Sequence, residues 1–321
     1  MTDLAARLAA RRPHVLAVEV PGQWRLRARV EHELARRGWP TACSPADADV
    51  LAVCGRPGPD VNRAVDLVWD QLPGPRVRIS VSADTDVPAA LADAVAGLRD
   101  TGRQREDARR RATQPVLPAG DMDHGDMDHG DMDHGDMDHG DMDHGDMDMA
   151  PAGIPLAEGA EDRDGLEMDV LHIRLGPILP YWPGGLVLHC TLHGDVIAEA
   201  HAAWLDAEHL SVPAGPDIPA ARQCDHLRDL LALAGVPREA ERARRARDAI
   251  LAGAEPGQVR PLLDDLERGV RRGRMLRWSL RGLGSLAEND LHHRGEPAGW
   301  AGDVYDRLLR RIQCARNGID L

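Results

Sequence analysis

Residues 121–149 read DMDHGDMDHGDMDHGDMDHGDMDHGDMDM, five DMDHG units followed by a truncated one. The only apolar side chain in each unit is a methionine, so this stretch cannot form a packed core. It therefore divides the chain of 321 residues into two parts, each long enough for an ordinary domain. We expect domains at residues 1–100 and 166–321, joined by a disordered linker over residues 101–165.

The charge of the chain is concentrated in the repeats. The formal net charge is −14, and residues 121–149 contain twelve aspartates and no arginine, so the rest of the chain is nearly neutral. Phosphates would be repelled by such a linker, and we expect no nucleic-acid partner. No run approaches the roughly eighteen consecutive apolar residues of a transmembrane helix, so we expect no membrane span.

The cysteines are scattered and form no CxxC pair. The five are Cys43, Cys54, Cys190, Cys224 and Cys314. This usage is typical of free, mostly buried thiols in a reducing compartment. We therefore expect a cytoplasmic protein, or one that lies peripherally on the inner face of the cell membrane.

The first hundred residues alternate strand-like and helix-like patterns. Residues 49–54 (DVLAVC) form a continuous apolar run, typical of a strand covered on both faces. The expected order is strand 14–20, helix 24–37, strand 49–54, helix 61–72, strand 76–82 and helix 88–98. Strand and helix repeated three times predict a parallel sheet with right-handed crossovers.

The second half begins with strands and continues with helices. Residues 169–174, 185–192 and 196–201 are strand-like, with Gly194-Asp195 as the turn of a hairpin. After Pro219 the apolar residues follow helical spacing. The first expected helix carries Leu227, Leu230, Leu231 and Leu233 on one stripe. It is followed by a helix at 238–250, by the apolar residues Leu262, Leu263, Leu266 and Val270, and by a last helix at 301–316. The predicted fold class is thus α/β plus mainly α, an N-terminal parallel-sheet domain followed by a β-hairpin and a helical bundle.

Each repeat places imidazole, carboxylate and thioether groups within five residues. Imidazole suits Cu(II), Ni(II) and Zn(II), and the thioether adds Cu(I). We expect copper or nickel to bind here through His124, His129, His134, His139, His144, Asp123, Asp128, Asp133, Asp138 and Asp143. Neutral imidazole is the ligand form, so binding should weaken in mild acid. The alternative is a solvated acidic spacer produced by repeat expansion.

The sequence of residues 44–82 resembles the B-type small subunit of respiratory complex I and its hydrogenase relatives. In that family a strand reading SPRQADVLIVAG precedes a helix ending in YDQMPEP and a strand containing VIS. Here residues 44–54 read SPADADVLAVC, and residues 69–75 read WDQLPGP. The resemblance covers most of the first hundred residues and implies an α/β fold that holds an iron–sulfur cluster on cysteine thiolates.

The cysteine ligands of that family are replaced in this chain. Val15 and Leu16 precede the Ala17-Val18-Glu19 stretch where the family has two adjacent cysteines. Ser82 and its neighbours occupy the turn that would carry a third. Because valine and leucine cannot bind iron, we expect no conventional four-cysteine cluster. Cys43 and Cys54 are interpreted as packing thiols.

Residues 169–316 resemble the D-type large subunit of complex I, the relative of the [NiFe]-hydrogenase large subunit. The matches run in family order through Leu175-Gly176-Pro177, Ala234-Gly235-Val236-Pro237-Arg238 and Gly302-Asp303-Val304-Tyr305-Asp306-Arg307. The last reproduces the family's GDVYDR and is the most specific. The resemblance implies quinone and NAD binding by similarity. Hydrogenase CxxC motifs are absent from the chain.

The quinone-binding histidines of that family also have no counterpart. Aligned from Gly176-Pro177, they become Leu179 and Pro183, with Tyr181 and Trp182 between them. These four side chains can line an apolar pocket but do not supply a pair of proton donors. We therefore expect neither nickel–iron chemistry nor standard quinone reduction.

Four further patterns receive structural interpretations. His189, Cys190 and His193 place the histidines on one face of a strand and the cysteine on the other, which disfavours a shared metal. His292-His293 is assigned to a polar loop. Gly55-Arg56-Pro57-Gly58 lacks the Lys-Ser/Thr of a phosphate loop and is assigned to a plain turn. Asp303, Tyr305 and Arg307 are expected to cap the last helix.

The sequence thus predicts a degenerate NADH-quinone oxidoreductase or hydrogenase-like subunit pair fused in one chain. We expect a non-catalytic assembly or accessory subunit whose partners are subunits of a complex I-like or hydrogenase-like membrane complex. One alternative is an active oxidoreductase subunit with the family's quinone or NAD binding. Another is a copper or nickel storage or delivery protein.

Overall fold

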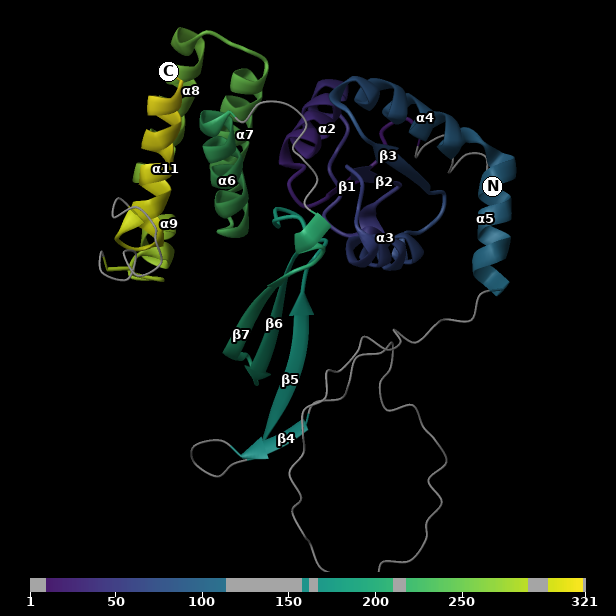
Figure 1. Ribbon diagram of the computed structural model, residues 1–321, viewed down its shortest axis with the longest axis horizontal. Helices are drawn as coiled ribbons and strands as arrows, with labels where there is room; N and C mark the ends of the chain where they lie inside the picture. The colour runs from purple at the N-terminus through teal and green to yellow at the C-terminus, as the bar shows by residue number, and fades with distance from the viewer. Residues whose placement is uncertain (1–9, 114–157, 162–166, 210–217, 288–299, 320–321) are drawn as a thin grey trace, which may run out of the picture. The chain divides into compact units, whose positions relative to one another are not determined.

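A computed structural model describes residues 10–113, 158–161, 167–209, 218–287 and 300–319 of the chain (Figure 1). Packing divides the chain into two compact units. Among the described residues, the first contains 10–104, 176–186, 204–209, 218–287 and 300–319, so it joins the N-terminal part to the C-terminal helices. Among the described residues, the second contains 105–113, 158–161, 167–175 and 187–203. The fold class expected from the sequence, α/β plus a hairpin and helices, is confirmed.

The N-terminal lobe, residues 10–104, is built on a parallel sheet in the order β1-β2-β3. Its strands are β1 (Val15–Glu19), β2 (Val50–Cys54) and β3 (Val77–Val81), and its helices are α2 (Trp24–Arg37), α3 (Pro59–Gln71) and α4 (Val87–Arg99). Val15 pairs with Val50, and Val50 with Val77. All three strands and all three helices were predicted within two residues of these bounds.

Helices cover both faces of this sheet, which explains the unbroken apolar run of β2. Every residue of Val50–Cys54 is buried. Leu26 and Val30 of α2 share one core with Leu91 of α4. Val61 and Val65 of α3 belong to a second core on the opposite face, and Figure 1 shows α3 across the sheet from α2 and α4.

The chain reverses its direction of travel across the sheet at β1. Beyond β1, on the side away from β2, Thr41 forms an isolated parallel bridge with Val15. The chain therefore passes from β1 to this edge through α2, and then returns past β1 to β2. Such a reversal is a topological switch point, and in open α/β sheets the ligand crevice lies outside the carboxyl ends of the strands there.

The C-terminal helices form the bundle expected from the spacing of the leucines. They are α6 (Pro219–Leu233), α7 (Pro237–Leu251), α8 (Pro256–Arg272), α9 (Arg274–Leu280) and α11 (Val304–Gly318). Leu227 and Leu231 pack with Leu266 and Ile312. Leu233 was wrongly placed on the stripe, since it is 55% exposed. Leu233 lies two positions after Leu231, so its side chain is rotated by roughly 200° from that of Leu231 and faces away from the core.

The second unit contains an antiparallel sheet in the order β4-β5-β6-β7. Its strands are β4 (Glu158–Glu161), β5 (Glu167–Leu175), β6 (Leu186–His193) and β7 (Val196–Trp204). The predicted hairpin turn is present, with Gly194 at a φ of 59°, a value that favours glycine. α5 (Thr101–Thr113) and β4 lie within the range expected to be linker.

Candidate functional site

The crevice at the switch point is occupied by the chain's own residues 176–186. This segment, here called the insertion loop, crosses the carboxyl end of β1, where a Cβ on Gly184 would lie 2.4 Å from the carbonyl oxygen of Glu19. A side chain at residue 184 would therefore push the loop away from the sheet. The loop also closes on itself, because Trp182 Nε1 donates to the carbonyl oxygen of Leu186 at 2.7 Å.

The start of α3 is also covered by a residue far away in the sequence. Asp206 accepts hydrogen bonds from the backbone amides of Asp60 at 3.2 Å and Val61 at 2.9 Å. These amides are free donors at a helix N-terminus, where an anionic ligand can bind. A Cβ on Gly58 would lie 2.4 Å from Asp206 Cγ. Gly58 therefore allows the carboxylate of Asp206 to take the place of an external anion.

A small cavity remains between the insertion loop and β1. Its volume is about 50 Å³, and its lining includes Leu179, Tyr181, Trp182, Cys43, Glu19 and Arg228. Of the four predicted loop residues, the structure brings Leu179, Tyr181 and Trp182 together at this cavity, whereas Pro183 is exposed. Pockets for drug-sized ligands measure roughly 300–1,000 Å³. The observed space is well below that range.

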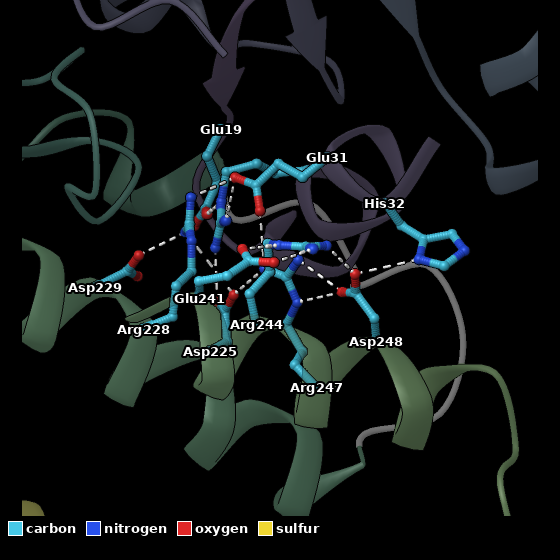
Figure 2. Close-up of polar contacts among 11 residues, drawn as sticks. Glu19, Glu31, His32, Asp225, Arg228, Asp229, Glu241, Arg244, Arg247 and Asp248 are labelled. Atoms are coloured by element: carbon cyan, nitrogen blue, oxygen red, sulfur yellow. Dashed lines mark hydrogen bonds and ion pairs between the residues drawn. The ribbon is translucent and has the colours of Figure 1, made fainter. Parts of the chain in front are cut away.

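The charged residues of the cavity lining belong to a cluster of buried charges, which joins the N-terminal lobe to the C-terminal helices (Figure 2). Arg27 of α2 is its first centre. Its guanidinium donates to Glu19 at 2.6 Å, to Glu31 at 2.7 Å and to Asp225 of α6 at 2.6 Å. The three carboxylates thus use all three nitrogens of Arg27.

Glu31 is the second centre of this buried charge cluster. It accepts from Arg27, from Arg228 of α6 at 2.6 Å and from Arg247 of α7 at 2.8 Å. The side chain of Arg247 is 0% exposed and also donates to Asp225 at 2.7 Å. One glutamate of α2 is therefore bound by arginines of two helices that follow about two hundred residues later in the chain.

Further charged and aromatic side chains contact the arginines at the periphery of the cluster. Asp248 accepts from Arg247 at 2.8 Å and from Arg244 at 2.5 Å, and its carboxylate lies 3.1 Å from His32 Nδ1. Arg228 pairs with Asp229 at 2.5 Å. The guanidinium of Arg228 also lies 4.8 Å from the centre of the Tyr181 ring, a cation–π contact. The insertion loop is thereby tied to the charge cluster.

The pKa values of the central carboxylates reflect these contacts. Burial alone would raise the pKa of Glu31, but Arg228, Arg27 and Arg247 hold that pKa well below its usual range. Burial opposes ionisation of Asp225 as well, and the same three arginines lower its pKa. Burial raises the pKa of Glu19, with Arg27 only partly offsetting it. Glu31 and Asp225 are therefore carboxylates in the folded protein near neutral pH.

The cysteines fit the packing interpretation with one exception. Cys54, Cys190 and Cys224 are buried, and Cys314 is partly buried. Burial raises the pKa of the Cys224 thiol to about 12 and that of Cys54 still further, so both remain protonated near neutral pH. Cys43 was wrongly interpreted as a packing thiol, since it is exposed. It follows Thr41 at the sheet edge, beside the cavity rather than under a helix.

The predicted metal ligands of the repeats, the five histidines and five aspartates from Asp123 to His144, lie outside the described residues, as does His292-His293. His189 and His193 are exposed and Cys190 is buried. The histidines thus face away from the cysteine, as their positions on the strand predicted. Within the described part of the chain, no three His, Cys, Asp or Glu side chains are grouped so that they could hold a metal.

The expected cap of the last helix is present, with the side chain of Asp306 in place of that of Tyr305. Asp303 accepts from the amides of Asp306 at 2.9 Å and Gly282 at 2.8 Å, and Asp306 reaches back to the amide of Asp303. Arg307 binds the carbonyl oxygen of Gly302 at 2.6 Å. Tyr305 instead points into the bundle, where it is buried against Val270. The GDVYDR motif therefore caps the last helix and packs it against the bundle.

Comparison of the chain with family models, with curated proteins and with solved structures found no match.

Proposed function

We propose that this chain is a degenerate pair of complex I-like or hydrogenase-like subunits, fused and folded together as a non-catalytic assembly or accessory subunit. Its partners in this proposal are subunits of a complex I-like or hydrogenase-like membrane complex in the cytoplasm or on the inner face of the membrane. The observation that carries the proposal is the buried charge cluster. Its ion pairs join the N-terminal lobe to helices α6 and α7, and these are the parts that resemble the small and the large subunit.

The cluster supports permanent pairing. Removing one partner from a buried ion pair typically costs about 3–5 kcal/mol, since the other charge is left desolvated. Arg247, Glu31 and Asp225 are each at most 5% exposed in their side chains. Separation of the N-terminal lobe from α6 and α7 would break several such contacts at once. The two parts should therefore act as one surface toward a partner.

The closed crevice supports a non-catalytic role. The insertion loop fills the place where an open α/β sheet binds its ligand, and Asp206 occupies the amides that would receive a phosphate. The cavity left over, about 50 Å³, is several times smaller than a typical ligand pocket. A quinone ring or a nicotinamide would need the insertion loop to move.

Affinity purification of the tagged chain from its native host, with solubilised membranes, tests the proposal. Subunits of a complex I-like or hydrogenase-like complex should be recovered in fixed ratio. A variant with Arg27→Gln and Arg247→Gln should lose them, because the paired surface is disturbed, whereas Arg36→Gln and Arg245→Gln on exposed faces should retain them. Recovery of the chain alone, or equal recovery with all variants, would contradict an accessory role.

The repeats favour a second candidate, a copper or nickel storage or delivery protein. Five histidines within 121–149 supply the imidazole that both metals prefer. Calorimetric titration with Cu(II) and Ni(II) should show binding to the full chain and loss of it when 121–149 is deleted. A variant with the five histidines changed to asparagine keeps the length and tests the ligands directly. Identical isotherms for all three proteins would end this candidate.

A further inference from the structure

One short helix carries large apolar side chains that the fold leaves uncovered. In α9, Met275 is 73% exposed and Trp278 is 77% exposed, and Leu283 after the helix is 54% exposed. Residues three apart in a helix are neighbours on its surface, so Met275 and Trp278 form one apolar ridge. A Trp exposed to this degree is uncommon, because burial of its ring would be favourable.

The opposite face of α9 fixes this ridge in place. Leu276 is 3% exposed and belongs to the core with Leu266 and Leu308, and Leu280 packs against the same core. The helix cannot turn Met275 and Trp278 inward without bringing Leu276 and Leu280 out. The exposed ridge is therefore a consequence of how α9 is anchored to the bundle.

The surroundings of the ridge are strongly basic. From residue 268 to residue 287 the sequence reads RGVRRGRMLRWSLRGLGSLA, with six arginines and no acidic residue, in a chain whose net charge is −14. Arg272, Arg274 and Arg277 are exposed. Within the described residues, none of these three has a carboxylate partner, whereas Arg271 is paired with Glu267 at 2.7 Å. The basic side chains nearest the ridge are thus available to an anion.

We propose that α9 is a docking surface for an anionic phospholipid bilayer. Tryptophan favours the level of the lipid headgroups, where its ring is apolar and its N–H is wet. Arginines beside it would meet the phosphates, and each basic residue near an anionic surface strengthens binding about fivefold. Met275 and Leu283 add apolar area at the acyl boundary. An acidic protein would match the arginines but gives no reason for a ridge of Trp and Met.

The inference goes beyond the proposed accessory function and does not depend on it, because lipid binding is measured on the purified chain alone. Vesicle flotation with phosphatidylcholine containing phosphatidylglycerol, and with phosphatidylcholine alone, is the experiment. The full-length protein should float with the anionic vesicles and remain behind with the neutral ones. Tryptophan fluorescence with brominated lipids should show quenching that Trp278→Phe reduces.

Two variants separate the contributions of charge and ridge. Changing Arg272, Arg274 and Arg277 to Gln should weaken binding to anionic vesicles about a hundredfold, from three factors of about five. Changing Met275 and Trp278 to Ser should also weaken it. The matched controls are Gln at Arg36, Arg63 and Arg245, which are 65%, 67% and 64% exposed elsewhere, and Trp204→Ser, which is 56% exposed.

Since all these positions are exposed, circular dichroism should show the wild-type melting temperature for each variant. Absence of binding to anionic vesicles would overturn the proposal. Equal binding by the α9 variants and the controls would overturn it as well, because lipid would then meet another surface. Binding to immobilised polyglutamate but not to vesicles would replace it with an acidic protein partner.

Discussion

Glu31 shows most clearly how single residues hold this protein together. Its carboxylate lies among three arginines from three helices, at a depth where an unpaired charge is costly. The helical spacing of Leu26, Val30 and Leu34 predicted α2 correctly, but the sequence analysis assigned no role to Arg27 and Glu31. Their spacing did offer a signal of burial, because Arg27 directly follows Leu26 and Glu31 directly follows Val30 on the apolar side of the helix.

Replacement of Glu31 by Gln tests the buried charge cluster at this scale. The free energy of unfolding should fall by about 3–5 kcal/mol, because three guanidinium groups lose their shared anion. Urea denaturation followed by circular dichroism measures it. As a control, Glu106→Gln removes an exposed i,i+4 pair with Arg110 and should change stability by less than about 1 kcal/mol. Similar effects of the two changes would show that the cluster is not buried in solution.

The same carboxylates predict how stability depends on pH. The pKa values of Glu31 and Asp225 are lower in the folded protein than in the unfolded chain. Their contribution is therefore present above the unfolded pKa values, about 4, and is lost as pH falls toward the folded ones. Urea midpoints should decrease between about pH 5 and pH 2. The decrease should be smaller in Asp225→Asn, and a midpoint that stays constant or rises between about pH 5 and pH 2 would contradict the assignment.

At the scale of elements, α3 depends on a cap that comes from a distant segment. Pro59 begins the helix, as proline often does, but the sequence around it provides no side chain that caps the amides. Asp206 supplies it from a position about one hundred and fifty residues later. Local sequence patterns cannot reveal such a cap, because its partner is defined only by the fold.

Asp206→Ala should therefore lower the free energy of unfolding by roughly 1–2 kcal/mol, the range observed for lost helix caps. It should also loosen the insertion loop, since Leu205 binds Gly185 at 2.9 Å beside it. Hydrogen exchange of the amides of Asp60 and Val61 should speed up more than that of β2. Asp93→Ala, an exposed change in the middle of α4, is the control. Unchanged exchange at α3 would contradict the cap.

The elements that could be predicted are those with strong periodicity. The apolar run of β2 and the stripes of α2, α6 and α11 each indicated the correct structure. α9 was missed because RMLRWSL has apolar residues on two faces, and β4 was missed because EGAE has almost none. Both elements depend on packing or pairing with segments elsewhere in the chain. A short stretch of sequence does not contain that information.

At the scale of the molecule, the sequence correctly indicated an α/β part, a hairpin and a helical part. The apolar patterns did not indicate that the N-terminal lobe and the C-terminal helices would share one compact unit, and only the family resemblance implied such a pair. That association rests on charged side chains of both parts, and pairing of charges across two hundred residues leaves no periodic signal. The loop residues Leu179, Tyr181 and Trp182 were chosen from a family resemblance, and the structure places them at one cavity.

We propose above all that this paired scaffold carries no electron-transfer centre of its own. Electron paramagnetic resonance of the chain, purified without oxygen from cells supplied with iron and then reduced with dithionite, tests it most directly. We predict a colourless protein with no iron–sulfur signal and no iron bound in stoichiometric amount. A brown protein with a reducible paramagnetic centre would contradict the account.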